Sequence, residues 1–379
     1  MAGLLSRLVP RRVVAAVGLL SFVVGCGGRS EKPRDSIPEE YAQACWLTVP
    51  RDVATISEAM ARTPSTGIVC IEPGIYTDAI LLHDGISLRG TDDGVHLCGG
   101  TRGAELVEGV TLQRLTIGGM FELDSPAKLT LDHVRRDGAD PSCRAYGPHG
   151  VLLDASHGGT LALTVDGGTF APDGFWYADV STKGPAADVG LSVKNVRCLA
   201  PECGFFARFP DTFPPGSSFH ALLENNVLAT ADESSPVAGE LELFLDDAER
   251  SELRLVHNTF FMEGSYVPAI SLGRDSTVPV RLRGNALADY DSVVERGDDE
   301  VDSIEWDEGG NVTAFGSDHT PEGPWWDAWW VNTTAGDFHP APGSPLIAAG
   351  GEDEPGTDAL GVARGRWSDA GALEAIGSL

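Results

Sequence analysis

Hydrophobic residues along most of this chain come in short runs that alternate with polar residues at a period of two. Such runs lie at Ile68–Ile71, Ile80–Leu82, Ile86–Leu88, Val110–Leu112 and Leu129–Leu131. Gly, Asp and Asn separate the runs, which is typical of strands joined by turns. The pattern therefore predicts an all-β fold built from many short strands.

One segment near the start of this pattern has helical rather than strand character. It is Thr55–Ala61, with the sequence Thr-Ile-Ser-Glu-Ala-Met-Ala, which begins with a good N-cap residue and has a glutamate three positions later. A single short helix is therefore expected ahead of the strands.

The later strands resemble one another, and each is followed by a glycine or an asparagine. The similar segments are Leu161–Phe170, Leu222–Leu228, Leu253–Phe260 and Val280–Leu287. Gly168, Asn226, Asn258 and Asn285 align at the end of the repeat, with Asn195 fitting within a residue, at steps of 27 to 32 residues. A repeat of this length without a helix predicts a solenoid in which strands stack in layers. Asn tolerates the left-handed backbone region, and its amide can bond to the same amide one layer away, so a structural role is favoured for these asparagines.

The ends of the repeat region resemble the right-handed parallel β-helix proteins of the pectin-lyase-like superfamily. The entrance resemblance rests on Val53–Met60, on Ile68–Tyr76 with its Pro-Gly-Ile-Tyr turn, and on Ile86–Gly90. The closing segment, Asp337–Leu346 and then Asp358, Gly361, Arg364 and Asp369–Glu374, is similar to one found on bacterial β-helix repeat proteins. The resemblance implies a β-helix over residues 45–320 with a short N-terminal capping helix, followed by a closing segment over 321–379.

The N-terminus carries the pattern of an export signal. Arg7, Arg11 and Arg12 precede an apolar run that ends in Val23-Val24-Gly25-Cys26, and this run is too short to span a bilayer as a helix. The segment resembles a bacterial lipoprotein signal, which implies a signal peptide over 1–25 and lipidation of Cys26. The alternative is an ordinary secretory signal that happens to contain a cysteine. Residues 26–44 are polar and proline-broken, which is typical of a flexible tether.

This N-terminal signal predicts a protein that is exported and lipid-anchored to a bacterial membrane. Gly27 after the cysteine is similar to lipoproteins sent to the outer membrane, so the outer membrane or the cell surface is expected. An even set of six cysteines then remains in an oxidising compartment, where disulfides are expected. Cys198 and Cys203 have the spacing of a stapled loop, and Cys45 could meet Cys70 if their strands lie in neighbouring layers, although spacing proves neither pair. The six are Cys45, Cys70, Cys98, Cys143, Cys198 and Cys203.

The net charge of the chain limits the kinds of molecule that it is expected to bind. The net charge is −29, with 56 acidic residues against 27 basic ones. A chain this acidic repels phosphate backbones, so no nucleic-acid partner is expected. No Cys or His set has the spacing of a metal site, and none is predicted.

Candidate catalytic residues come from the resemblance. It implies polysaccharides as the substrate class and, for a lyase, acidic residues that hold Ca²⁺ together with a basic residue that removes a proton. Leu131-Asp132-His133-Val134 resembles a strand motif of pectate lyases, so Asp132 and His133 are the lyase candidates, against the alternative of a solvated strand edge. The three motifs of polygalacturonase-like hydrolases, Asn-Thr-Asp, Gly-His-Gly and Arg-x-Lys, are all missing from the sequence.

Tryptophans concentrate near the end of the repeat region, at Trp325, Trp326, Trp329 and Trp330. If exposed, they could stack on sugar rings as a ligand-binding surface. The favoured alternative is that they pack against the last layer and seal the end of the core.

Three functions remain open from the sequence. The first expectation is a cell-envelope protein that binds a polysaccharide or another surface component. An enzyme, either a calcium-dependent polysaccharide lyase or a glycoside hydrolase, is the first alternative. A purely structural or adhesive surface protein is the second.

Overall fold

The chain divides into two units, Met1–Gln43 and Ala44–Leu379, and every residue described below belongs to the second unit. The predicted signal peptide, Cys26 and nearly all of the predicted tether lie outside the described residues. The computed structural model describes residues 44–92, 94–103, 107–119, 121–136, 143, 151–170, 176–181, 184–199, 205–208, 215–230, 241–244, 251–262, 270–272, 278–290, 294–296, 299–300, 305–306, 310–315, 329–335, 337–351, 356–365 and 367–375.

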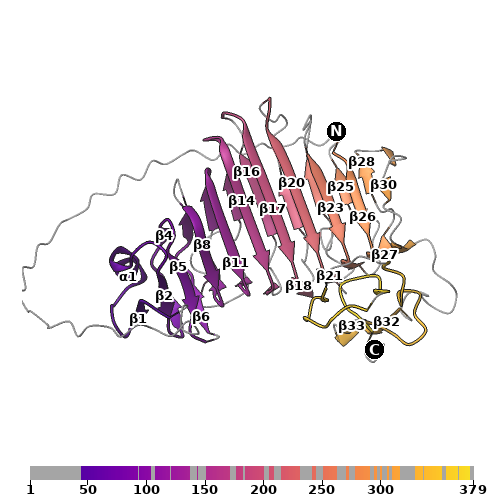
Figure 1. Ribbon diagram of the computed structural model, residues 1–379, viewed down its shortest axis with the longest axis horizontal. Helices are drawn as coiled ribbons and strands as arrows, with labels where there is room; N and C mark the ends of the chain where they lie inside the picture. The colour runs from indigo at the N-terminus through magenta and orange to yellow at the C-terminus, as the bar shows by residue number, and fades with distance from the viewer. Residues whose placement is uncertain are drawn as a thin grey trace, which may run out of the picture. The chain divides into compact units, whose positions relative to one another are not determined.

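Three long sheets make up most of this unit, and they are called sheet 1, sheet 2 and sheet 3 below. The chain visits them in a fixed order. Strand β2 (Ile68–Ile71) belongs to sheet 1, β3 (Gly74–Tyr76) to sheet 3 and β4 (Ile80–Leu82) to sheet 2, after which the chain returns to sheet 1. One visit to each sheet is called a rung below. Equivalent strands of successive rungs pair in parallel, and Figure 1 shows those of sheet 1 lying next to one another in chain order. The all-β character with long parallel sheets is as the sequence predicts.

The strands differ in length between the three sheets. Sheet 1 contains β1 (Leu47–Val49), β2, β5 (Ser87–Gly90), β8 (Val107–Gln113), β11 (Ala127–Asp132), β14 (Gly159–Asp166), β17 (Ala187–Lys194), β20 (Ser218–Glu224), β23 (Glu252–Val256), β26 (Val280–Arg283) and β30 (Glu305–Trp306). Sheet 2 contains β4, β7 (Thr101–Gly103), β10 (Phe121–Asp124), β13 (Val151–Asp154), β16 (Trp176–Ser181), β19 (Phe205–Arg208), β22 (Leu241–Phe244), β25 (Ile270–Leu272), β28 (Val294–Arg296) and β29 (Asp299–Glu300), the last antiparallel to β28. Sheet 3 contains β3, β6 (Val95–Leu97), β9 (Thr116–Ile117), β12 (Arg135–Arg136), β15 (Thr169–Phe170), β18 (Arg197–Leu199), β21 (Val227–Thr230), β24 (Thr259–Met262), β27 (Ala286–Tyr290) and β31 (Val312–Phe315).

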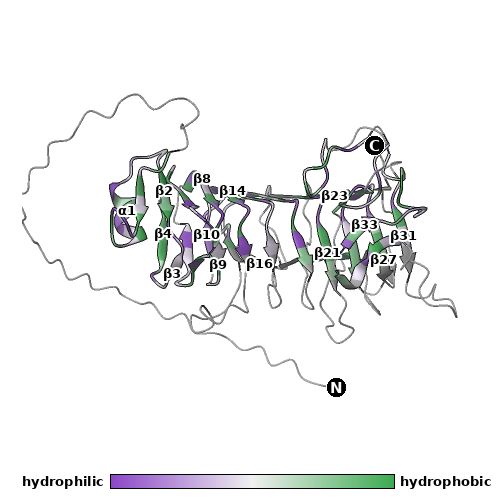
Figure 2. Ribbon diagram, turned by 90° about the horizontal axis from the view of Figure 1, so that it is seen from below, coloured by the Kyte–Doolittle hydropathy of each residue, from purple (hydrophilic) through white to green (hydrophobic). Residues whose placement is uncertain are grey.

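Alternation along the strands selects the buried face. In β14, Leu161, Leu163 and Val165 are buried, whereas the residues between them are half-buried, and β17 repeats this pattern in register. Figure 2 shows hydrophobic and polar positions mixed along the strands. Burying a leucine or valine side chain contributes about 1.5–3 kcal/mol, so a column of such residues through many rungs dominates stability.

The asparagines that follow the strands of sheet 1 form a ladder, which is buried at Asn226, Asn258 and Asn285. The side-chain amide of Asn226 donates to Asn258 (2.9 Å), that of Asn258 to Asn285 (3.0 Å), and that of Asn285 to Asn311 (2.9 Å). The predicted bonding between layers is confirmed for these residues. Val196, not Asn195, occupies the ladder column in the preceding rung, where its N–H donates to Asn226 Oδ1.

A short helix, α1 (Ile56–Arg62), lies in the segment for which the sequence predicts one. Thr55 is its N-cap, and its hydroxyl oxygen accepts a hydrogen bond from the Glu58 N–H at 3.2 Å. Ile56, Ala59 and Met60 recur at helical spacing and are buried against the core.

Disulfides join neighbouring parts of the fold. Cys45 is bonded to Cys70, in the strand that pairs with β1, and Cys98 is bonded to Cys143. Cys198 is also disulfide-bonded, while Cys203 lies outside the described residues. Disulfides form in oxidising compartments, so these bonds indicate such an environment, as expected for an exported protein.

In the described part of the C-terminal segment, β32 (Trp330–Asn332) and β33 (Asp337–Pro340) form a small antiparallel sheet and are joined by the 3₁₀ turn η5 (Thr333–Ala335). Trp329 and Trp330 are 1% and 3% exposed and pack in a second core with Phe261 and Phe338. This burial favours the sealing interpretation for these two tryptophans. Trp325 and Trp326 lie outside the described residues.

Candidate functional site

The corner between sheet 1 and sheet 3 is a two-residue turn that recurs rung after rung. Its first residue has a positive φ, and its second residue is the one that joins the ladder column. Glycine, asparagine and histidine predominate because the left-handed region costs other residues about 1–2 kcal/mol. The first residues are Arg114, His133, Gly167, Asn195, Asn225, His257, Gly284 and Gly310.

The two predicted catalytic residues lie together at this corner. Asp132 ends β11, and its carboxylate accepts a hydrogen bond from the Gln113 amide (2.6 Å) and lies 2.5 Å from His133 Nδ1. The His133 side chain is 70% exposed. Its ring lies over Gly167 of the next rung. A side chain at position 167 would place its Cβ only 3.1 Å from two atoms of this ring.

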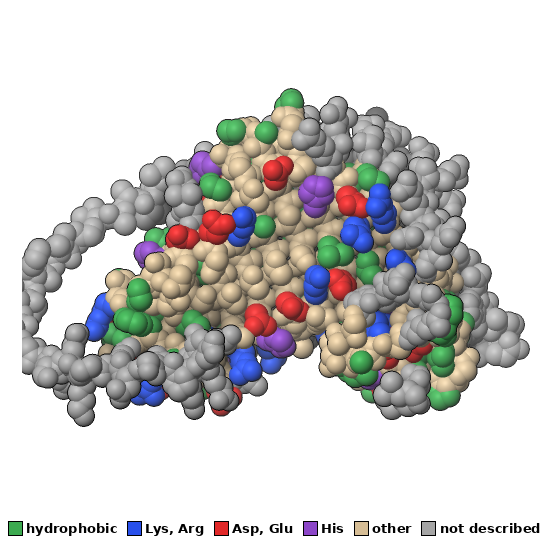
Figure 3. All heavy atoms as spheres, viewed as in Figure 1, with side chains coloured by type: hydrophobic (Ala, Val, Ile, Leu, Met, Phe, Trp, Pro, Cys, Tyr) green, Lys and Arg blue, Asp and Glu red, His purple; other side chains and the backbone are tan. Residues whose placement is uncertain are grey.

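An open groove of about 880 Å³ lies along this corner and along the first residues of the sheet 3 strands. Arg114 and His133 line it from the corner, and Arg135 and Arg197 line it from β12 and β18. His96 of β6 lies farther toward the N-terminal rungs. Figure 3 shows basic, acidic and histidine side chains close together, and a hollow beside the C-terminal part of the chain. The groove therefore gathers basic groups in a strongly acidic protein.

The acidic groups nearby already have partners. Asp166 accepts a hydrogen bond from the Asn195 amide at 2.7 Å. Asp358 is buried, and its carboxylate accepts from the N–H groups of Leu360, Val362 and Glu374. These bonds hold the carboxylates in place without removing their negative charges, so the described lining of the groove carries Arg114, Arg135 and Arg197 against Asp166 and Asp358, a small local excess of positive charge.

Arg197 also acts on the C-terminal segment. The pKa of Asp337 is lowered: burial acts to raise it, but hydrogen bonds from the His339 side chain and backbone, and the positive charges of His339 and Arg197, outweigh burial. Asp337 is therefore ionised at neutral pH, and it offsets part of the charge of Arg197.

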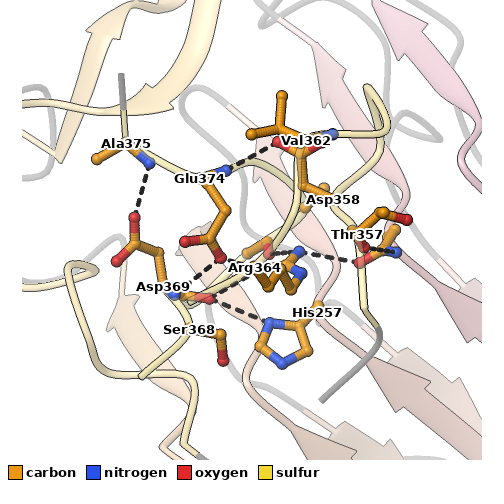
Figure 4. Close-up of polar contacts among 12 residues, drawn as sticks. His257, Thr357, Asp358, Val362, Arg364, Ser368, Asp369, Glu374 and Ala375 are labelled. Atoms are coloured by element: carbon orange, nitrogen blue, oxygen red, sulfur yellow. Dashed lines mark hydrogen bonds and ion pairs between the residues drawn. The ribbon is translucent and has the colours of Figure 1, made fainter. Parts of the chain in front are cut away.

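The C-terminal segment forms one end of the groove. Thr357, Asp358, Ala359, Leu360 and Gly361 line it there. Figure 4 shows how this segment is fastened to the corner: Arg364 lies at its centre, bonded to Glu374 Oε1 (2.6 Å) and to the backbone oxygen of Asp369 (3.3 Å).

Further bonds tie the same segment to three successive rungs. Asn225 donates to the Thr357 carbonyl and accepts from Arg364. His257 Nδ1 lies 3.1 Å from the Asp369 carbonyl, and the Gly371 N–H donates to the Gly284 carbonyl. The corner residues of these rungs are thus used for fastening, whereas those from Arg114 to Asn195 line the groove.

Sequence reasoning identified only part of this site. It selected Asp132 and His133 as candidates, but it missed His96, Arg114, Thr169 and Arg197. These residues have no local motif. Aligning the repeat through the ladder column would have placed Arg135 and Arg197 at the same position of different rungs, and that alignment was the available signal.

No family model, curated protein or solved structure matches this chain. In the described part of the chain, no helix is long and apolar enough to cross a membrane, and no three His, Cys, Asp or Glu residues are grouped so that they could hold a metal ion.

Proposed function

We propose that this protein is an exported, lipid-anchored, right-handed parallel β-helix of the pectin-lyase-like type, with α1 as its N-terminal cap, whose groove binds an acidic polysaccharide. Rotation of the chain through three parallel sheets supports the β-helix. The signal-like N-terminus and the disulfides support export to the outer membrane or the cell surface.

The observation that carries the binding proposal is the basic groove. Arg114, Arg135 and Arg197 come from three different rungs and line one surface of a chain whose net charge is −29. Charges are screened over about 8 Å at physiological ionic strength, so a bound polymer interacts mainly with the groove and not with the distant acidic surface. A carboxylate-bearing polymer matches this local charge, and a neutral polymer does not.

Removal of these three arginines tests the proposal. Each exposed ion pair contributes about 0.2–1 kcal/mol, so the triple variant R114A/R135A/R197A is expected to bind polygalacturonate roughly tenfold more weakly than the wild type. Affinity electrophoresis of the full-length protein in detergent, with polygalacturonate or neutral dextran in the gel, measures this effect.

Arg254 provides the matched control, because it is exposed on β23 and does not line the groove. R254A should bind like the wild type. Equal weakening by R254A, or no binding of polygalacturonate by the folded wild type, would leave the structural or adhesive function as the better proposal.

A second function, polysaccharide elimination, is favoured by His133, which lines the groove and whose Nδ1 lies next to the Asp132 carboxylate. His133 would remove the proton next to a uronate carboxylate held by an arginine. The electron pair then forms a carbon–carbon double bond while the glycosidic C–O bond breaks, and the leaving oxygen takes up a proton. Neither Ca²⁺ nor another cofactor is part of this proposal.

A lyase would produce an unsaturated uronate that absorbs ultraviolet light. If His133 is the base, H133A should lower the rate of this absorbance change about 10²–10⁴-fold, while binding of the polymer changes little. H220A is the control, since His220 is exposed on β20 and lies outside the groove. Absence of any product from wild-type protein that binds the polymer would support binding alone.

A further inference from the structure

The corner between sheet 1 and sheet 3 runs straight along the stack of rungs. Successive corner residues are linked by backbone hydrogen bonds, for example from the Arg114 N–H to the Asp132 carbonyl and from the Asn195 N–H to the Glu224 carbonyl, each at 3.0 Å. Arg114 and His133 are exposed at this corner and line the groove. This part of the corner is therefore accessible to a long ligand.

The C-terminal segment covers the next rungs of the same corner. Asn225 and His257 are buried, and both are bonded to this segment. At the following rung, the Gly371 N–H donates to the Gly284 carbonyl at 2.6 Å. The accessible part of the corner thus stops between Asn195, which lines the groove, and Asn225, which does not.

A turn at residues 357–361 forms the wall at this end of the groove. Asp358 is buried, and its carboxylate accepts from the N–H groups of Leu360 and Val362, each at 2.8 Å. The Asp358 N–H in turn donates to the Val362 carbonyl at 2.8 Å. Leu360 is exposed and lines the groove. The wall is therefore held from within, and it offers one apolar side chain to a ligand.

Among the described residues, the other end of the groove has no matching wall. The surface continues there from β6 over β3, where Ile75 is exposed. Between the two ends the groove spans five neighbouring strands of sheet 3, from β6 to β18. Parallel strands lie about 4.8 Å apart, so this length is roughly 19 Å and holds about four sugars of an extended chain.

We infer that the groove recognises the end of an acidic polysaccharide, with the terminal sugar against the 357–361 turn and the rest of the chain leaving over β6 and β3. This inference rests on the proposed function. The interior of a long chain does not fit, because it would have to pass through the turn at the point where Arg364 is bonded to Asn225 (2.9 Å). The terminal sugar instead places an apolar face on Leu360.

Bulky tags on a galacturonate tetrasaccharide test which ends are free. One form carries a fluorophore on the reducing end, and the other carries it on the non-reducing end. With full-length protein in detergent, fluorescence anisotropy should show binding of one form and at least a roughly tenfold weaker affinity for the other, whose tag meets the wall. The tolerated tag extends over β3.

Chain length gives a second measurement with the tolerated form as the labelled ligand. Unlabelled tetrasaccharide and polygalacturonate of roughly 40 sugars are added as competitors at equal mass, and the polymer should compete about tenfold more weakly, because it has about tenfold fewer ends per gram. Binding to the interior of the chain would make the two competitors about equal.

Two truncations on the same turn test the wall itself. L360A removes the apolar contact and should weaken binding of the tetrasaccharide about three- to tenfold. V362A is the matched control, because Val362 is also exposed but does not line the groove, and this variant should bind like the wild type.

The outcomes separate the inference from the function on which it rests. If both tagged forms bind alike, if polymer and tetrasaccharide compete equally by mass, or if L360A and V362A behave alike, end recognition is overturned while acidic polysaccharide binding stands. If neither tetrasaccharide nor polymer binds to folded wild-type protein, both are overturned. One tolerated tag, weak competition by the polymer and a loss confined to L360A support both.

Discussion

Asn258→Leu is expected to destabilise the folded protein by about 4 kcal/mol, because each buried polar group that loses its partner costs about 1–3 kcal/mol. Asn258 is fully buried, and its side chain makes four hydrogen bonds. Its amide donates to the Leu223 carbonyl (2.9 Å) and to Asn285 Oδ1 (3.0 Å). Its oxygen accepts from the backbone N–H and the side-chain amide of Asn226. Leucine has the same number of side-chain heavy atoms but is bulkier and satisfies none of these groups.

The loss should spread to neighbouring rungs, since the ladder connects Asn226, Asn258, Asn285 and Asn311. Urea denaturation gives the change in the free energy of unfolding, and hydrogen exchange shows which strands lose protection. Asn195→Gly is the matched control. Asn195 occupies the left-handed corner position, where glycine is well tolerated, and it bonds only outward to Asp166. A shift for N258L no larger than that for N195G would contradict a structural role for the ladder.

Arg364→Met is expected to destabilise the fold by about 3–5 kcal/mol, the usual cost of removing one partner from a buried ion pair. The Arg364 side chain is 2% exposed and bonds to Glu374. It also donates to Asn225 Oδ1 (2.9 Å) and to the Gly371 carbonyl (3.0 Å). Methionine replaces the aliphatic stem of the arginine but leaves Glu374 buried without its counter-charge.

The loss in R364M should depend on pH. Burial already raises the pKa of Glu374, with the charge of Asp369 acting in the same direction and Arg364 opposing both. Without the arginine this pKa rises further. A carboxyl group whose pKa is higher in the folded state takes up its proton on folding, so stability falls as pH rises through the folded pKa. The deficit of R364M should therefore be larger at pH 7 than near the ordinary pKa of glutamate.

Thermal unfolding at several pH values measures this dependence. The double variant R364M/E374Q removes the buried charge and should recover part of the loss at pH 7. R254M, at an exposed position, should change stability by less than about 0.5 kcal/mol. A deficit that is independent of pH and unaffected by E374Q would show that the ion pair is not what holds the closing segment.

The two variants also test how the groove is built. Residues 357–361 form its end, and Arg364 fastens the same segment to Asn225. Loosening that fastening should weaken polymer binding even though Arg364 does not line the groove. N258L, in comparison, acts through the rungs themselves.

Much of the fold could be predicted because its signals are local. The alternation in Leu161, Leu163 and Val165 selects the buried face of a strand without reference to any other segment. Asn226, Asn258 and Asn285 recur because only a few residue types suit a buried corner that bonds along the stack. Asp358 and Arg364 were selected from the sequence as members of a closing segment, and the structure shows which bonds these two residues make.

The groove could be predicted only in part. Asp132 and His133 are adjacent in the chain, so a local motif brought them forward. Arg135 and Arg197 lie two strands apart in space but 62 residues apart in sequence. Rungs differ in length, since the ladder column passes from Val196 to Asn226 in 30 residues and from Asn258 to Asn285 in 27. A fixed period therefore cannot show which side chains share a column.

The sequence by itself determined that this chain forms many short strands, a repeat with asparagine corners and one short helix near residue 56, because each depends on the backbone preferences and polarity of neighbouring residues. Only the tertiary structure decided that Trp329 and Trp330 are buried, that Arg364 bonds to Glu374 in the C-terminal segment, and that Arg114, Arg135 and Arg197 from three rungs line one groove. These features depend on strand register and on loop length, which bring together residues that are distant in the chain.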